Sequence, residues 1–86
     1  MGSYQIEWKP SALKELRGFQ KEAVRRIILT VEKLADNPFP SGVRKLVGSE
    51  YTYRVRIGDY RVIYSVYEQR LLIEIVRVGH RKDVYR

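Results

Sequence analysis

Three arginines gather around a short Gly-Asp pair in the second half of the chain. Arg54 and Arg56 precede Gly58-Asp59, and Arg61 follows it. Arginine keeps its charge at any physiological pH and donates paired hydrogen bonds that match the geometry of a phosphate group. These residues therefore form a candidate phosphate site, provided that the fold brings them onto one surface.

Two strands joined by a tight turn are predicted around the Gly-Asp pair. Apolar and polar residues alternate over 51–57, and a second strand pattern covers 60–67. Glycine adopts the positive φ that a two-residue hairpin turn needs, so Gly58-Asp59 is expected to join the two strands. Such a turn also determines which residues lie opposite each other.

The expected register brings the three arginines to one side of the sheet. Arg56 lies opposite Arg61 and Arg54 lies opposite Ile63, and opposite residues share a face. The other face is the predicted core face, with Tyr53, Val55, Ile57, Tyr60, Val62 and Tyr64. Like charges across a ladder destabilise a hairpin, so either the side chains extend into water or an anion lies between them. Arginine at all three positions favours the anion.

The remaining pattern predicts the elements that position this hairpin. In order, we expect a strand at 4–8, helices over about 10–20 and 22–35, a loop at 41–48, the hairpin, a turn at 68–70 and a last strand at 71–79. The fold class is therefore α+β, in the order β-α-α-β-β-β. Both helices pack on one face of a mostly antiparallel sheet, and the arginine face is left open.

The register of the last strand is less constrained. A turn at Glu68-Gln69 would place Tyr64 opposite Ile73 and Glu74 beside Ile63 on the arginine face. We interpret Glu74 as a structural partner of the arginines in preference to a catalytic residue. Strict alternation would then put His80 on the arginine face, whereas a bulge at Gly79 would reverse this.

Composition limits the classes of protein to consider. The 86 residues are expected to form one domain, 1–86, with a net charge of +7 that favours a polyanionic partner such as nucleic acid. There is no cysteine, so neither a disulfide nor a thiolate metal site is expected, and a reducing cytoplasm fits this composition. No membrane span or secretion signal is expected from the hydropathy.

Four segments together resemble the RelE family of toxins, within the RelE/ParE superfamily. They are Arg44-Lys45-Leu46-Val47-Gly48, Tyr53-Arg54-Val55-Arg56, Gly58-Asp59-Tyr60-Arg61-Val62-Ile63-Tyr64 and Val78-Gly79-His80-Arg81-Lys82-Asp83-Val84-Tyr85. The resemblance covers nearly the whole chain. It implies a microbial-ribonuclease-like fold and a toxin of a toxin–antitoxin system that cleaves messenger RNA in the ribosomal A site. The cleavage it implies is a metal-free attack by the 2′-hydroxyl, with no cofactor. The implied partners are a cognate antitoxin and the ribosome, through 16S ribosomal RNA and the A-site message.

The resemblance also implies a set of catalytic residues, which by motif are Arg54, Arg56, Arg61, Arg81 and Tyr85. The first two are lysines in the best-known members, and arginine in their place argues against a lysine general base. We expect Arg61 and Arg81 to hold the phosphate, and Arg54 and Arg56 to orient the 2′-hydroxyl or bind ribosomal RNA. Tyr85 is expected to stack on a base, to assist proton transfer or to anchor the tail on the core.

Other residues are weaker candidates. His80 is the single histidine and a possible acid or base, although a lone histidine at a strand end is more often structural. Glu50 is a still weaker candidate base. Four basic residues are expected to contact RNA phosphates: Arg44, Lys45, Arg77 and Lys82.

Three alternatives remain open from the sequence. A ParE-like protein would share the fold but poison DNA gyrase and have no nuclease site. A non-enzymatic RNA-binding module could use some of the seven tyrosines for stacking, although Tyr53, Tyr60 and Tyr64 are predicted to face the core. A degenerate toxin would keep the fold without activity.

Overall fold

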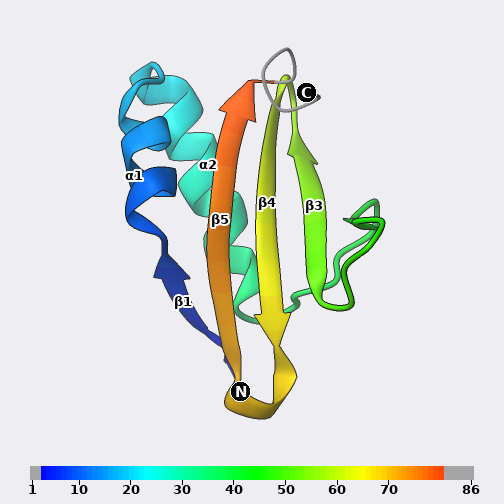
Figure 1. The fold of residues 1–86 in the computed structure, drawn as a ribbon. Coiled ribbons are helices and arrows are strands. Elements are labelled where there is room, and N and C mark those ends of the chain that lie inside the picture. Colours follow the sequence, from blue (N-terminus) through cyan, green and yellow to red (C-terminus); the bar gives the residue numbers. More distant parts are fainter. Residues whose placement is uncertain (1–2, 81–86) are drawn as a thin grey trace.

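The computed structural model describes residues 3–80 and shows two helices packed on one face of a five-stranded sheet (Figure 1). The elements are β1 (Gln5–Trp8), α1 (Pro10–Arg17), α2 (Lys21–Leu34), β2 (Arg44–Lys45), β3 (Thr52–Ile57), β4 (Tyr60–Tyr67), the short 3₁₀ helix η1 (Glu68–Arg70) and β5 (Leu72–His80). The strand order is β1-β5-β4-β3-β2. The predicted α+β class and the order of the main elements are confirmed.

Both helices present an apolar stripe to the sheet. Pro10 occupies the first turn of α1, where its missing N–H is not needed, and Ala12 and Leu16 are buried one turn apart. The buried residues of α2 follow the same three- and four-residue spacing: Ala23, Ile27, Val31 and Leu34. These side chains pack against the core face of β3, β4 and β5, so the helices cover one side of the sheet and leave the other open.

The hairpin between β3 and β4 has the predicted register. Arg56 lies opposite Arg61, Arg54 opposite Ile63, and Ile57 opposite Tyr60. Gly58 has a φ of 60°, which only glycine adopts without strain in such a turn. The three arginines therefore lie on the open face of the sheet.

The register between β4 and β5 differs from the prediction by two residues. Tyr64 lies opposite Ile75, and Glu74 lies opposite Ser65 instead of Ile63. The turn is longer than expected because η1 and then Leu71, at a φ of 49°, intervene before β5 begins. The register then shifts between Ile63 and Tyr64, which leaves Val76 as a bulge without an opposite residue.

Two edge strands complete the sheet. β1 pairs with β5 in parallel, which the linear pattern alone does not indicate. On the opposite edge, Arg44 and Lys45 form a two-residue strand against β3, whereas we predicted a loop over this segment. Val43, just before this strand, is half-buried and packs against the core. No helix within residues 3–80 is long and apolar enough to cross a membrane.

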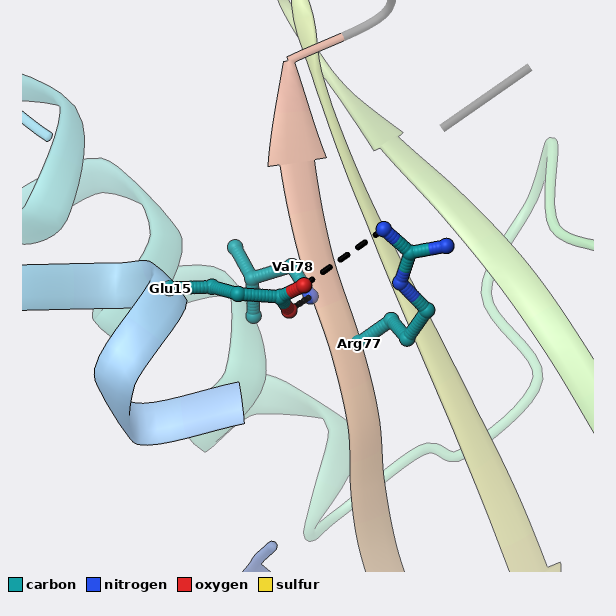
Figure 2. A network of polar contacts seen from close by, with 3 residues as sticks. All are labelled: Glu15, Arg77 and Val78. Carbon is teal, nitrogen blue, oxygen red and sulfur yellow. Dashed lines mark hydrogen bonds and ion pairs between the residues drawn. The ribbon is translucent and has the colours of Figure 1, made fainter. Parts of the chain in front are cut away.

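β1 pairs only with the first part of β5, and a carboxylate from α1 binds the edge of β5 that β1 leaves unpaired (Figure 2). Glu15 accepts a hydrogen bond of 2.8 Å from the backbone N–H of Val78. It also forms an ion pair with Arg77, in which Nη2 of Arg77 lies 3.4 Å from the carboxylate. An unpaired strand edge is a site for unwanted association, and an acceptor from a neighbouring element satisfies it. α1 is thereby tied to the last strand.

Candidate functional site

Four arginines surround one hollow on the open face of the sheet. Arg44, Arg54, Arg56 and Arg61 line it together with Gly42, and its volume is about 420 Å³. We call this the arginine hollow. Among the described residues, no carboxylate belongs to its lining. The predicted phosphate cluster is therefore present, and it contains one arginine more than the hairpin supplies.

Three neighbouring strands position these side chains. β4 carries Arg61 and β3 carries Arg54 and Arg56, in the register described above. The short strand β2 adds Arg44 directly opposite Arg54, so that both point to the same face. Gly42 precedes β2 with a φ of 88°, a left-handed conformation that glycine adopts at little cost.

The four guanidinium groups differ in exposure. Arg61 belongs to the central part of the sheet and is only 5% exposed, whereas Arg44 and Arg56 are exposed. Gly79 lies opposite Arg61 on β5 and has no side chain to cover it. Arg56 donates a hydrogen bond of 3.2 Å from Nε to the carbonyl oxygen of Gly58, which holds it beside the hairpin turn. The hollow thus has a buried floor and exposed charged walls.

This arrangement is suited to binding and stabilising negative charge. Like-charged guanidinium groups around one hollow repel one another, and an anion between them relieves the repulsion. Their N–H groups donate to phosphate oxygens in pairs, and a partly buried donor interacts more strongly than one in water. The same donors would stabilise the extra charge that develops when a phosphate is attacked.

His80 lies on the helix side of the sheet, not on the arginine face that strict alternation predicts. It is opposite Tyr60, and the two rings meet edge to face with centroids 5.3 Å apart. The ring centroids of Tyr60 and Phe19 are in turn 4.9 Å apart. A bulge does move His80 away from the arginine face, as the alternative prediction allowed, but the bulge is at Val76 and not at Gly79.

The candidate RNA contacts separate into different regions. Arg44 joins the hollow, although the sequence suggested only a peripheral role for it. Lys45 is opposite Tyr53 and so points to the other face of the sheet. Arg77 is opposite Ile63 on the open face, but it pairs with Glu15 and does not line the hollow. Arg81, Lys82 and Tyr85 lie outside the described residues.

The part of Arg44 and Gly42 in the hollow has little signal in the sequence. A strand of two residues shows no alternation, so its pairing with β3 cannot be read from the pattern. The only local indication is the glycine that precedes the basic pair.

Known proteins similar to this chain are toxins. The family model described as "ParE toxin of type II toxin-antitoxin system, parDE" matches residues 6–85. A putative RelE-like toxin protein of Escherichia coli is 32% identical over 85 residues, which cover 95% of this chain and 90% of that protein. The putative toxin RelE1 of Methanocaldococcus jannaschii is 30% identical over 86 residues, which cover 96% of each chain.

Solved structures agree with the sequence relatives. A chain of the archaeal RelE-RelB complex from Pyrococcus horikoshii superposes with a TM-score of 0.83 at 32% identity, and the match covers 94% of this chain and 98% of that one. The isolated E. coli RelE toxin has the same fold, with a TM-score of 0.81 at 23% identity over 96% of this chain and 92% of that one. The chain therefore belongs to the RelE family of toxins, in the RelE/ParE superfamily of toxin–antitoxin systems.

Proposed function

We propose that this toxin is a ribosome-dependent endoribonuclease that cleaves messenger RNA in the A site. The observation that supports the proposal is the arginine hollow, where four guanidinium groups meet on an open sheet face without a carboxylate in the described lining. Guanidinium groups donate paired hydrogen bonds to phosphate oxygens, so several of them around one hollow suit a phosphate site.

The proposed reaction is an internal transfer of the phosphate. The 2′-oxygen of a nucleotide loses its proton and forms a bond to the adjacent phosphorus, and the bond from phosphorus to the 5′-oxygen breaks. The 5′-oxygen takes up a proton, and the product is a 2′,3′-cyclic phosphate. In this scheme Arg61 holds a non-bridging oxygen from the floor of the hollow, with Arg81 as a second donor. Arg54 and Arg56 orient the ribose and stabilise the transition-state charge.

The arginines of the hollow cannot accept the proton of the 2′-hydroxyl, because guanidinium groups stay protonated in proteins. We assign that role to Tyr85 or to a group of the ribosome. His80 is a further candidate, although its ring packs against Tyr60 on the helix side of the sheet. Ribosomal participation would explain a dependence of cleavage on translation.

Two partners follow from the proposal. One is the ribosome, where basic side chains around the hollow would contact 16S ribosomal RNA in the cytoplasm. The other is a cognate antitoxin, since the similar Pyrococcus horikoshii structure is a RelE-RelB complex. A protein that inhibits translation requires such a partner to remain harmless.

Primer extension on a translated message, after the protein is induced, tests the proposal. We expect new 5′ ends within codons, which disappear when translation initiation is blocked. Arg61→Ala should lower the cleavage about 100- to 1000-fold, the usual cost of losing one donor to transition-state charge. Lys33→Ala is the matched control, because it removes an exposed cation of α2 that lines no hollow.

A gyrase poison is the competing function, because the matching family model carries the ParE description. Growth arrest with intact messages and with double-strand breaks in DNA would establish this alternative and overturn the ribonuclease. Cleavage that Arg61→Ala leaves unchanged would instead overturn the role of the arginine hollow.

A further inference from the structure

A second hollow lies at the opposite end of the sheet and has different chemistry. Its volume is about 440 Å³. We call it the aromatic hollow, since four rings line it. Its described lining consists of Phe39, Glu50, Tyr51, Tyr53, Val66, Tyr67, Glu68, Gln69 and Arg70. Nothing in the proposed ribonuclease uses these residues.

The aromatic hollow and the arginine hollow open on different sides of the sheet, although Tyr53 of the one and Arg54 of the other are consecutive residues of β3. Arg56 and Arg61 flank the turn between β3 and β4, whereas η1 forms the turn at the other end of β4 (Figure 1). Tyr53 is opposite Tyr64 and belongs to the helix side of the sheet. α2 ends at Leu34, and the segment that follows brings Phe39 against Tyr53. The two hollows therefore differ in both the face and the end of the sheet.

The rings of the aromatic hollow are held in place by contacts with one another. The centroids of Phe39 and Tyr53 are 5.1 Å apart in an edge-to-face arrangement, and those of Tyr51 and Tyr67 are 5.2 Å apart. Tyr51 is nevertheless 49% exposed and Phe39 is 39% exposed. A ligand would thus meet rings that need little ordering on binding.

The charges in this region favour a cation as the ligand. Glu50 and Glu68 are both exposed in the lining, in a chain whose net charge is +7. The guanidinium carbon of Arg70 already lies 5.7 Å from the centroid of the Tyr67 ring. The face of an aromatic ring attracts a guanidinium or ammonium group, and nearby carboxylates add to this attraction. The lining holds these two carboxylates against the one guanidinium of Arg70, so its balance is negative and disfavours the phosphate of a nucleotide.

We propose that the aromatic hollow binds a basic side chain, arginine above all, presented by a protein partner. The rings supply the flat faces on which a guanidinium group stacks, and Glu50 and Glu68 supply acceptors at the rim. This inference is independent of the ribonuclease, because it uses the other face and the other end of the sheet.

An NMR titration of the full chain tests the proposal. The probe is the blocked tripeptide acetyl-Gly-Arg-Gly-amide, and the matched control contains citrulline, which has a similar shape and no charge. We expect saturable shifts of the side-chain resonances of Tyr51 and Tyr67 and of the backbone amide of Glu68 with the arginine peptide. The citrulline peptide should bind at least several-fold more weakly.

Three variants locate the binding within the hollow. Glu50→Gln and Glu68→Gln keep the size of each side chain, and each should weaken binding about two- to fivefold, as for an exposed ion pair. Tyr67→Leu should weaken it further by removing a ring face. The amide spectrum of each variant reports whether the fold is retained, and Glu22→Gln on α2 is the control for a carboxylate that lies elsewhere.

Three outcomes would overturn the inference. The first is equal binding of the arginine and citrulline peptides, which would show that charge is not recognised. The second is no saturable response in the hollow to either peptide. The third is tighter binding of uridine or adenosine monophosphate to the same residues, which would make the hollow a base-stacking site.

Discussion

The two hollows differ in how the protein satisfies the residues that line them. In the aromatic hollow the rings contact one another, and Tyr53 also stacks on the fully buried Tyr64 at 6.0 Å. In the arginine hollow four like charges share one space, as two pairs that each lie directly across a ladder. The first arrangement stabilises the fold through ring contacts, whereas the second brings like charges together, and an anion bound between them would relieve their repulsion. Residues that oppose folding are thus better indicators of function than residues that support it.

The largest expected effect that tests this comparison is on RNA affinity. If four arginines contact phosphates, the affinity for a short RNA with a 2′-deoxy attack site should fall roughly 50-fold between 50 and 200 mM salt, from a slope of about 0.7 per contact. Arg56→Gln should lower that slope by about 0.7. Fluorescence anisotropy measures both quantities. An affinity that does not depend on salt would mean that the arginine hollow does not bind the backbone.

A loss of stability is expected on the aromatic side. Tyr64 donates a buried hydrogen bond of 2.7 Å to the carbonyl oxygen of Pro38, next to the Phe39 wall of the hollow. Tyr64→Phe leaves that carbonyl without its donor and should reduce the free energy of unfolding by about 1–3 kcal/mol. Urea denaturation at neutral pH measures this, and a change below about 0.3 kcal/mol would show that the bond is unimportant.

The same tyrosine predicts a dependence on pH. Burial, and to a smaller extent the neighbouring Tyr53, raises the pKa of the Tyr64 hydroxyl above its usual value. As the pH rises, the hydroxyl of Tyr64 therefore loses its proton in the unfolded chain before it does so in the folded protein. Its contribution to the free energy of unfolding is complete below about pH 10 and declines as the pH rises further. Unfolding curves between pH 9 and 11 should show a steeper loss in the wild type than in Tyr64→Phe. Identical slopes would contradict this.

A gain of stability is expected on the arginine side. Arg56→Gln removes one member of the like-charged pair with Arg61 and should stabilise the free protein by about 0.2–1 kcal/mol at low salt. The gain should shrink at high salt because Arg56 is exposed. Thermal unfolding at two salt concentrations measures it, with Arg25→Gln on α2 as the control. Destabilisation by Arg56→Gln would remove the basis of the comparison.

The smallest effect is expected at an arginine of the open face that belongs to neither hollow. The ion pair of Arg77 with Glu15 is partly exposed and 3.4 Å long, so Arg77→Ala should change the free energy of unfolding by at most about 0.5 kcal/mol. Glu15→Ala should cost more, about 1 kcal/mol, because it also removes the acceptor for the N–H of Val78. Denaturant unfolding of both variants shows which of them loses more stability. Equal losses would mean that the ion pair alone accounts for the stabilisation by Glu15.

Local chemistry explains which parts of the fold could be predicted. The register of β3 and β4 follows from a two-residue turn around Gly58 and from strict alternation, which together allow only one pairing of the two strands. The register of β4 and β5 depends on how Leu71 and η1 extend the turn, and no single residue type signals that. The parallel pairing of β1 with β5 joins segments far apart in the chain, so it is decided by packing and not by local pattern.

The same reasoning applies to the candidate site. Arg54, Arg56 and Arg61 could be placed together because they flank one predictable turn. Arg44 could not, since its position depends on a strand of two residues held by β3. The aromatic hollow was not anticipated either, because Phe39, Tyr51 and Tyr67 come from three separate segments that meet only in the folded chain.

The bulge at Val76 determines which side of the sheet each later residue of β5 faces. With Val76 outside the ladder, Gly79 faces Arg61 and His80 faces Tyr60, whereas pairing of Val76 with Ile63 would put the two on the other faces. A deletion of Val76 would remove the bulge and leave these pairings unchanged, because Ile75 and Arg77 already lie opposite the adjacent residues Tyr64 and Ile63. The bulge therefore changes which alternate residues of β5 face the core: Ile73 and Ile75 do so before it, and Val78 and His80 lie on the same side after it. One strand thus supplies both faces of the sheet although its sequence does not alternate regularly from end to end.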